Sequence, residues 1–196
     1  MKLEFFFDYG SPYSYLADTR LTGLQTRTDC EVEYRPMLLG GIFKATGNRS
    51  PAEETVVPKL QYQSTELKRW VDHYGVSFAS NPFFPINTLQ LMRVAHAAQA
   101  DGVFQAFHEV VFKAMWAQEK NLGDPEVLVP VLEEAGLDGG ALLAMASKPE
   151  VKKSLMDTSQ EAVARGAFGA PTFFVGEAMF FGNDRLDFVE RALLAE

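Results

Sequence analysis

The stretch Phe7-Asp8-Tyr9-Gly10-Ser11-Pro12-Tyr13-Ser14-Tyr15 joins an apolar run to a helix and decides the fold. The run before it, residues 2–7, is aromatic and apolar, as in a strand buried on both faces. Gly10 allows a turn, Ser11 is a good N-cap, and Pro12 falls at the first helical position, where its missing N–H costs nothing. We therefore predict a strand followed by a helix that begins at Pro12 and runs to about residue 26.

The rest of the chain predicts a second strand, a long helical stretch and a closing hairpin. Residues 30–36 alternate and end in proline, so they complete a strand–helix–strand unit with a parallel pair. From residue 39 to residue 166 the apolar spacing is mostly helical. Residues 169–176 and 178–181 then predict two strands that form a hairpin, with a final helix after them.

This order of elements is that of an α/β, thioredoxin-like fold (βαβ…ββα) that carries a large all-helical insertion. We expect residues 1–38 and 167–196 to form the thioredoxin-like domain, and residues 39–166 to form the helical insertion domain. The last helix is expected to begin near Arg185, with Asn183 or Asp184 as its N-cap.

Composition and charge exclude several classes of function. Hydrophobic residues make up 47% and charged residues 22% of the 196 residues, which is typical of a soluble folded protein and excludes disorder. Acidic residues outnumber basic ones by 26 to 18, which argues against a nucleic-acid partner. No stretch is apolar enough for a membrane helix or a signal peptide, so we expect a cytoplasmic protein. With one cysteine, Cys30, the chain holds no internal dithiol couple.

Four short motifs carry a resemblance to a known family. They are residues 7–15, Gly47-Asn48, residues 168–172 (Phe-Gly-Ala-Pro-Thr) and residues 181–185 (Phe-Gly-Asn-Asp-Arg). In this order and at these separations the chain resembles, over nearly its full length, the family of 2-hydroxychromene-2-carboxylate isomerases and kappa-class glutathione transferases. That family has a DsbA-like thioredoxin fold. The resemblance implies glutathione as cofactor, a small aromatic substrate and a homodimer.

The serines of the first motif stand where thioredoxin-like oxidoreductases have Cys-X-X-Cys. A helix N-terminus lowers the pKa of a thiol, so this place keeps its electrostatics without its sulfur. The sulfur is then expected to come from a ligand, and glutathione is the obvious one. The resemblance implies that Ser11 is the catalytic residue and donates its hydroxyl hydrogen to the glutathione thiolate. From the residues alone, an N-cap role is enough to explain Ser11.

The two later motifs are expected to hold the same ligand. By resemblance, Pro171 is a cis-proline, and the Ala170 backbone bonds the cysteinyl part of glutathione. Residues 183–185 open the last helix, a ready site for a carboxylate. Backbone N–H groups near Asp184 and Arg185 are expected to take the γ-glutamyl carboxylate, and the Asp184 carboxylate the ammonium. Asn183 belongs to this set.

The remaining candidates lie in the first helix and the insertion. The resemblance places Pro12 and Tyr13 at the glutathione site, with Asn48 on its backbone, while Lys59 could bind its glycyl carboxylate. Lys44 and Asn87 are candidates for the acceptor substrate. We expect no metal site, because the three histidines show no ligand spacing; they are His73, His96 and His108.

Three functions remain open at this point. The first is a glutathione-dependent isomerase that acts by transient thiolate addition, ring opening, bond rotation and elimination. The second is a kappa-class glutathione transferase or peroxidase, which uses the same glutathione site with another acceptor pocket. The third is a non-catalytic binding module on a thioredoxin fold. Glutathione affinity separates the first two from the third.

Overall fold

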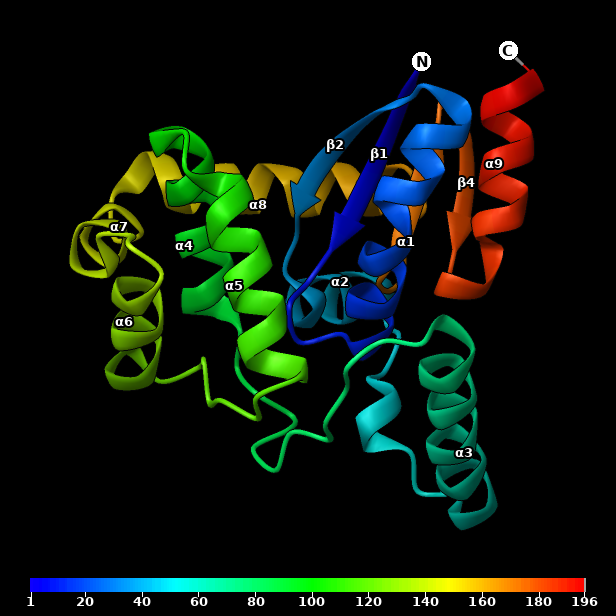
Figure 1. Ribbon diagram of the computed structural model, residues 1–196, viewed down its shortest axis with the longest axis horizontal. Helices are drawn as coiled ribbons and strands as arrows, with labels where there is room; N and C mark the ends of the chain where they lie inside the picture. The colour runs from blue at the N-terminus through cyan, green and yellow to red at the C-terminus, as the bar shows by residue number, and fades with distance from the viewer. Residues whose placement is uncertain (196) are drawn as a thin grey trace.

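A four-stranded mixed sheet lies at the centre of the fold, in the order β2-β1-β3-β4. The computed structural model describes residues 1–195 (Figure 1). β1 (Lys2–Phe7) pairs in parallel with β2 (Glu31–Pro36) and antiparallel with β3 (Thr172–Val175). β4 (Ala178–Phe181) closes the edge as an antiparallel hairpin with β3. The predicted βαβ…ββα order is therefore confirmed.

Helices cover both faces of this sheet, and a layer of further helices extends from one side (Figure 1). In chain order they are α1 (Pro12–Thr28), α2 (Leu39–Thr46), the 3-10 turn η1 (Pro51–Glu53), α3 (Val57–Tyr74), α4 (Leu89–Asp101), α5 (Phe104–Trp116), α6 (Pro125–Glu134), α7 (Gly139–Met145), α8 (Pro149–Ala164), the 3-10 turn η2 (Asn183–Arg185) and α9 (Leu186–Ala195). None of the helices described in residues 1–195 combines the length and apolarity needed to cross a membrane.

The alternation of side chains along β1 explains the layers. Phe5 and Phe7 point to the face covered by α1, α9 and the α4–α5 pair, where they join the main hydrophobic cluster. Phe6 points to the other face and packs in a smaller cluster with Ile42 of α2 and Ala162 of α8. A strand buried on both faces is thus confirmed, and it places the carboxyl end of β1 between helices from both layers.

The main cluster also continues from the sheet into α4–α7 without a break. Its members include Leu3 of β1 and Leu142 of α7. In addition, α8 covers the second face of the sheet, although it belongs to the inserted part of the chain (Figure 1). The thioredoxin-like part and the helical insertion are therefore packed as one body with a shared core.

Three local details differ from the sequence prediction. The last helix opens as the 3-10 turn η2, whose N-cap is Gly182, so the expected N-cap at Asn183 or Asp184 is wrong. Gly182 has φ 104° and ψ 152°, a conformation open to glycine and unfavourable to other residues. The turn η1 was not anticipated. Finally, the apolar positions of α3 include no buried residue, and this helix projects below the sheet (Figure 1).

Candidate thiol-binding site

Ser11 lies at the N-terminus of α1, at the end of the turn that follows β1. Its Oγ accepts a hydrogen bond from the Ser14 N–H at 3.1 Å, which confirms the predicted N-cap. The Ser11 side chain is 5% exposed. The Ser14 hydroxyl, in contrast, is fully buried and has no hydrogen-bond partner within residues 1–195. The two serines therefore occupy unlike environments.

The loop before β3 meets this N-terminus at the end of the sheet where β1 ends. The Ala170–Pro171 peptide is cis, as expected from the resemblance. The Ser11 hydroxyl donates to the Ala170 carbonyl at 3.1 Å, although the two residues are 159 positions apart. The site thus brings together a hydroxyl, a helix N-terminus and the backbone before the cis-proline, and the first two of these stabilise an anion such as a thiolate.

Tyr13 connects the start of α1 to α3 and η2. Its side chain is half-buried, and burial raises the pKa of its phenol, with further contributions from the negative charges of Glu66 and Asp184. Tyr62 of α3 also contributes to this shift, so the first turn of α1 lies beside both elements. The Asp184 carboxylate therefore lies within electrostatic range of the Tyr13 phenol.

Residues 183–185 form a tight turn next to α1. Asp184 makes an ion pair with its neighbour Arg185, and the Arg185 N–H donates to the Gly182 carbonyl at 3.3 Å. The Arg185 N–H, which is expected to bind the γ-glutamyl carboxylate, therefore already has the Gly182 carbonyl as its acceptor. Asn183 is 3% exposed, its carbonyl accepts from the Tyr74 hydroxyl at 2.9 Å, and its Nδ2 finds no partner in the described chain. This amide is therefore a buried, unpaired donor among the described residues.

Asn48 reaches the cis-proline loop from the end of α2. Its Nδ2 donates to the Phe168 carbonyl at 2.9 Å, two residues before Ala170, and its Oδ1 accepts from the Arg49 N–H at 2.8 Å. The structure therefore brings Asn48 beside the segment that carries Ala170.

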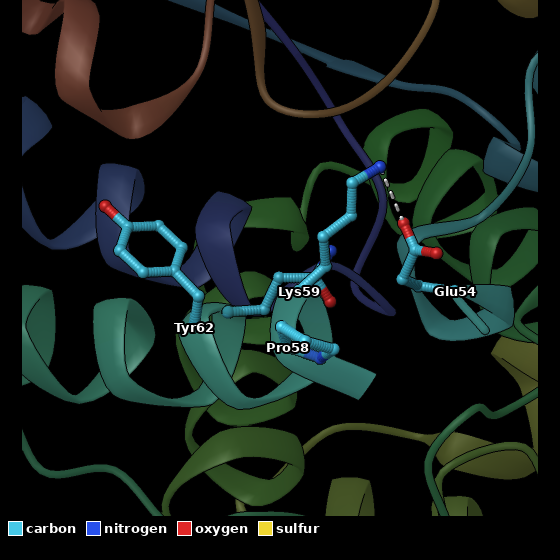
Figure 2. Close-up of a pocket in the computed structure, with 5 residues that line it drawn as sticks. Glu54, Pro58, Lys59 and Tyr62 are labelled. Atoms are coloured by element: carbon cyan, nitrogen blue, oxygen red, sulfur yellow. Dashed lines mark ion pairs between the residues drawn. The ribbon is translucent and has the colours of Figure 1, made fainter. Parts of the chain in front are cut away.

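Lys59 lines an open surface pocket of about 400 Å³ at the start of α3. Its Nζ lies 3.2 Å from a carboxylate oxygen of Glu54, and Figure 2 shows the two side chains extended toward each other. Pro58, Tyr62 and Gln63 complete the lining. The hydrogen bond from the Val56 N–H contributes most to lowering the pKa of Glu54, and the hydrogen bond from the Lys59 side chain contributes next. The pocket lies on α3, a helix that contacts α1.

Neither a hydrogen bond nor an ion pair joins the two substrate candidates, Lys44 and Asn87, in residues 1–195. Lys44 lies exposed in the last turn of α2 and forms no ion pair with any group in residues 1–195. Asn87 is exposed, and its Oδ1 accepts from the Leu89 N–H at 3.0 Å, which gives it a structural task at the start of α4. Among the residues described, no three His, Cys, Asp or Glu side chains are grouped to hold a metal ion.

Comparisons with known proteins agree with this geometry. A family model for the DSBA-like thioredoxin domain matches residues 2–194. The chain is 34% identical over 192 residues to a 2-hydroxychromene-2-carboxylate isomerase of Sphingobium xenophagum, a match that covers 98% of this chain and 97% of the relative. The chain belongs to the DsbA-like family of 2-hydroxychromene-2-carboxylate isomerases and kappa-class glutathione transferases.

Two further relatives mark the two branches of this family. Glutathione S-transferase kappa 1 of Homo sapiens is 28% identical over 210 residues, covering 97% of this chain and 90% of the relative. A solved structure of 2-hydroxychromene-2-carboxylate isomerase superimposes with a TM-score of 0.86 at 30% identity, covering 98% of this chain and 94% of that chain. The relatives are isomerases or glutathione transferases, which supports an enzyme.

Sequence reasoning assigned no role to several residues that shape the site. Asp8 is fully buried at the end of β1, where burial raises the pKa of its carboxyl and hydrogen bonds from backbone N–H groups oppose the rise. The Thr88 hydroxyl donates to the Asp8 carboxylate, and the Tyr74 hydroxyl donates to the Asn183 carbonyl. Glu54 forms an ion pair with Lys59. A polar residue directly after a buried strand was the available signal for Asp8. The other three depend on tertiary contacts that no local pattern encodes.

Proposed function

We propose that the chain is a glutathione-dependent isomerase of 2-hydroxychromene-2-carboxylate or a closely similar aromatic substrate. The observation that carries the proposal is the Ser11 hydroxyl, which caps α1 and faces the Ala170 carbonyl in a chain that has no dithiol. The relatives named 2-hydroxychromene-2-carboxylate isomerase support the substrate class. The relative named glutathione S-transferase kappa 1 supports glutathione as the ligand.

When bound, glutathione would supply a thiolate for addition to the ring alkene. After ring opening and rotation about the resulting carbon–carbon single bond, elimination of the thiolate would restore the alkene in the trans form. Ser11 holds this sulfur in its ionised form. The Ser11 hydroxyl hydrogen rotates from the Ala170 carbonyl to the sulfur, while Oγ still accepts the hydrogen bond from the Ser14 N–H. The N-terminus of α1 adds its positive end to the same point. The Ala170 carbonyl, released by Ser11, accepts a backbone N–H of the ligand.

The remaining residues orient the ligand. Asn48 binds the peptide backbone of glutathione. Lys59 binds the glycyl carboxylate and gives up its exposed ion pair with Glu54 to do so. Asn183 and Asp184 take the γ-glutamyl end, which carries both a carboxylate and an ammonium. Pro12 and Tyr13 form the wall between these two ends. We assign Lys44 and Asn87 to the acceptor substrate, whose carboxylate a cation and an amide can bind.

A second function is favoured by the kappa-class relatives, which have the same coverage of the chain at lower identity. A glutathione transferase or peroxidase would use Ser11 in the same way and differ only in its acceptor. We also propose that the protein acts in the cytoplasm, which maintains a glutathione pool. It is expected to act as a homodimer, which light scattering would show as twice the mass of one chain.

The test combines binding and turnover. Calorimetry is expected to give glutathione a dissociation constant below ~1 mM, equivalent to about 4 kcal/mol of binding free energy. Conversion of 2-hydroxychromene-2-carboxylate to the trans-alkene keto acid is then expected to require glutathione. Turnover of an aryl halide or an organic hydroperoxide without isomerisation would assign the transferase or peroxidase function instead. Absence of glutathione binding would leave the non-catalytic binding module.

A further inference from the structure

One buried carboxylate near Ser11, that of Asp8 directly after β1, has no role in the proposed function. Asp8, which is fully buried, accepts three hydrogen bonds. The Gly10 N–H donates to its Oδ1 at 2.9 Å. The Leu39 N–H and the Thr88 hydroxyl both donate to its Oδ2, at 2.9 and 3.0 Å. No other buried side chain of the described residues joins three segments so distant in sequence at the site.

Each of these donors stands at the start of a helix. Gly10 precedes Ser11, the N-cap of α1, and the Ser11 N–H also donates to the Asp8 main-chain oxygen at 2.9 Å. Leu39 is the first residue of α2, whose N-cap makes no side-chain hydrogen bond to its own helix. Thr88 is the N-cap of α4, and its hydroxyl is directed to Asp8 rather than into α4. Asp8 therefore bonds groups at the N-termini of three helices.

We propose that Asp8 is a positioning residue for the reacting thiol: its carboxylate holds the Gly10–Ser11 turn of α1 in a fixed place against α2 and α4. The inference rests on the proposed function, since it assigns Asp8 to the site at which Ser11 is to hold the glutathione sulfur. Asp8 itself touches neither ligand nor substrate. It acts through Ser11, whose hydroxyl must point at the sulfur to within the narrow range of a hydrogen bond.

The pattern of donors explains why a carboxylate is needed at this place. All three groups donate, and two of them are backbone N–H groups that cannot turn away. An asparagine amide has one oxygen and one NH₂ group, so one of the two N–H groups would face another donor. The substitution Asp8→Asn keeps the shape and removes the charge. It must release either the Gly10 turn or the start of α2.

The proposal predicts the direction of a measurable shift. The pH dependence of thiolate absorbance is compared for glutathione bound to the wild type and to Asp8→Asn. Loosening of the Ser11 turn is expected to raise the pKa of the bound thiol by about one unit, which is tenfold less thiolate at neutral pH. The pH profile of kcat/KM is expected to move to higher pH by the same amount. Loss of a negative charge alone would move both to lower pH, because a nearby anion disfavours thiolate.

A reporter that needs no glutathione separates this inference from the proposed function. In a Cys30→Ala background, Ser11→Cys places a thiol at the N-terminus of α1, and its alkylation rate against pH gives its pKa. Adding Asp8→Asn is expected to raise that pKa as well. If the wild type binds no glutathione, the proposed function fails, and the reporter still decides the role of Asp8.

Two more variants keep the result decisive. Should Asp8→Asn not fold, Thr88→Val removes one donor to Asp8 and is expected to give a smaller shift in the same direction, which Thr88→Ser reverses. Leu142→Ala changes a buried residue of α7, a helix that lies well away from α1 in Figure 1, and is expected to lower stability and leave both pH profiles unchanged. A shift to lower pH, or a loss of stability with no shift at all, would overturn the proposal.

Discussion

Replacing Ser11 with alanine removes two hydrogen bonds and leaves the backbone of α1 in place. Oγ accepts from the Ser14 N–H and donates to the Ala170 carbonyl, both at 3.1 Å. Loss of an N-cap costs about 1 kcal/mol, and loss of the second bond costs about another 1 kcal/mol. For a chain of this length, a loss of roughly 2 kcal/mol lowers Tm by roughly 4–8 °C.

The same substitution also changes the thiol. A hydrogen bond to a charged group is worth roughly 1.5–3 kcal/mol, so its loss raises the pKa of the bound glutathione thiol by about one to two units. At neutral pH the thiolate fraction, and with it kcat/KM, is then expected to fall about tenfold or more. Saturating substrate does not restore the rate, because the missing bond acts on the reacting sulfur.

Ser14→Ala is the matched control, because it makes the same chemical change three residues further along α1. The Ser14 hydroxyl is buried and unpaired among residues 1–195, so its removal is expected to leave stability unchanged or to raise it by up to about 1 kcal/mol. It is expected to leave the thiol pKa unchanged. Thiolate absorbance and thermal unfolding of both variants give the comparison. Equal effects of the two substitutions, or none from Ser11→Ala on the thiol, would refute the reasoning.

Three further outcomes are expected. Lys59→Ala should weaken glutathione binding most at low salt while changing unfolding free energy by less than about 0.5 kcal/mol, since its pair with Glu54 is exposed; calorimetry across a salt series tests this. Burial lowers the pKa of His96 from its usual 6.5, so the folded state resists its protonation and stability falls as pH drops below 6.5. Unfolding scans of His96→Gln, which keeps a donor for the Pro36 carbonyl, should show a shallower fall. Gly182→Ala should cost roughly 1–3 kcal/mol in chemical unfolding, because a Cβ there would lie 2.4 Å from the Asp184 carboxylate in a backbone conformation suited to glycine.

The sequence predicted the elements well where the chemistry of capping is local. Ser11 and Pro12 mark the start of α1, and the observed helix begins at Pro12. The last helix was less accessible, because Gly182 adopts a positive φ and a 3-10 turn forms before α9. An Asn-Asp pair before a helix is typical of an N-cap, and nothing in it shows that the glycine before it takes the role.

The sequence indicates candidate residues for the site, but not the hydrogen bonds that join them. The hydrogen bond between Ser11 and Ala170 spans 159 positions, and only the assembled sheet brings β1 and the loop before β3 together. The task of Asp8 was hidden for the same reason, since its donors come from residues 10, 39 and 88. Asn87 was interpreted as a substrate ligand, whereas its side chain also bonds the start of α4.

The unequal surroundings of Ser11 and Ser14 bear on what kind of chemistry the fold can host. A dithiol site needs two groups that can reach each other and exchange electrons with a partner. Here only Ser11 has partners, one from its own helix and one from the facing loop, while the Ser14 hydroxyl is enclosed with none among the described residues. A single sulfur brought by a ligand could meet Ser11 alone. Because serine stands at both positions, the site has no sulfur pair of its own, and we expect chemistry at one ligand thiolate that adds to and leaves the substrate without a net change in oxidation state.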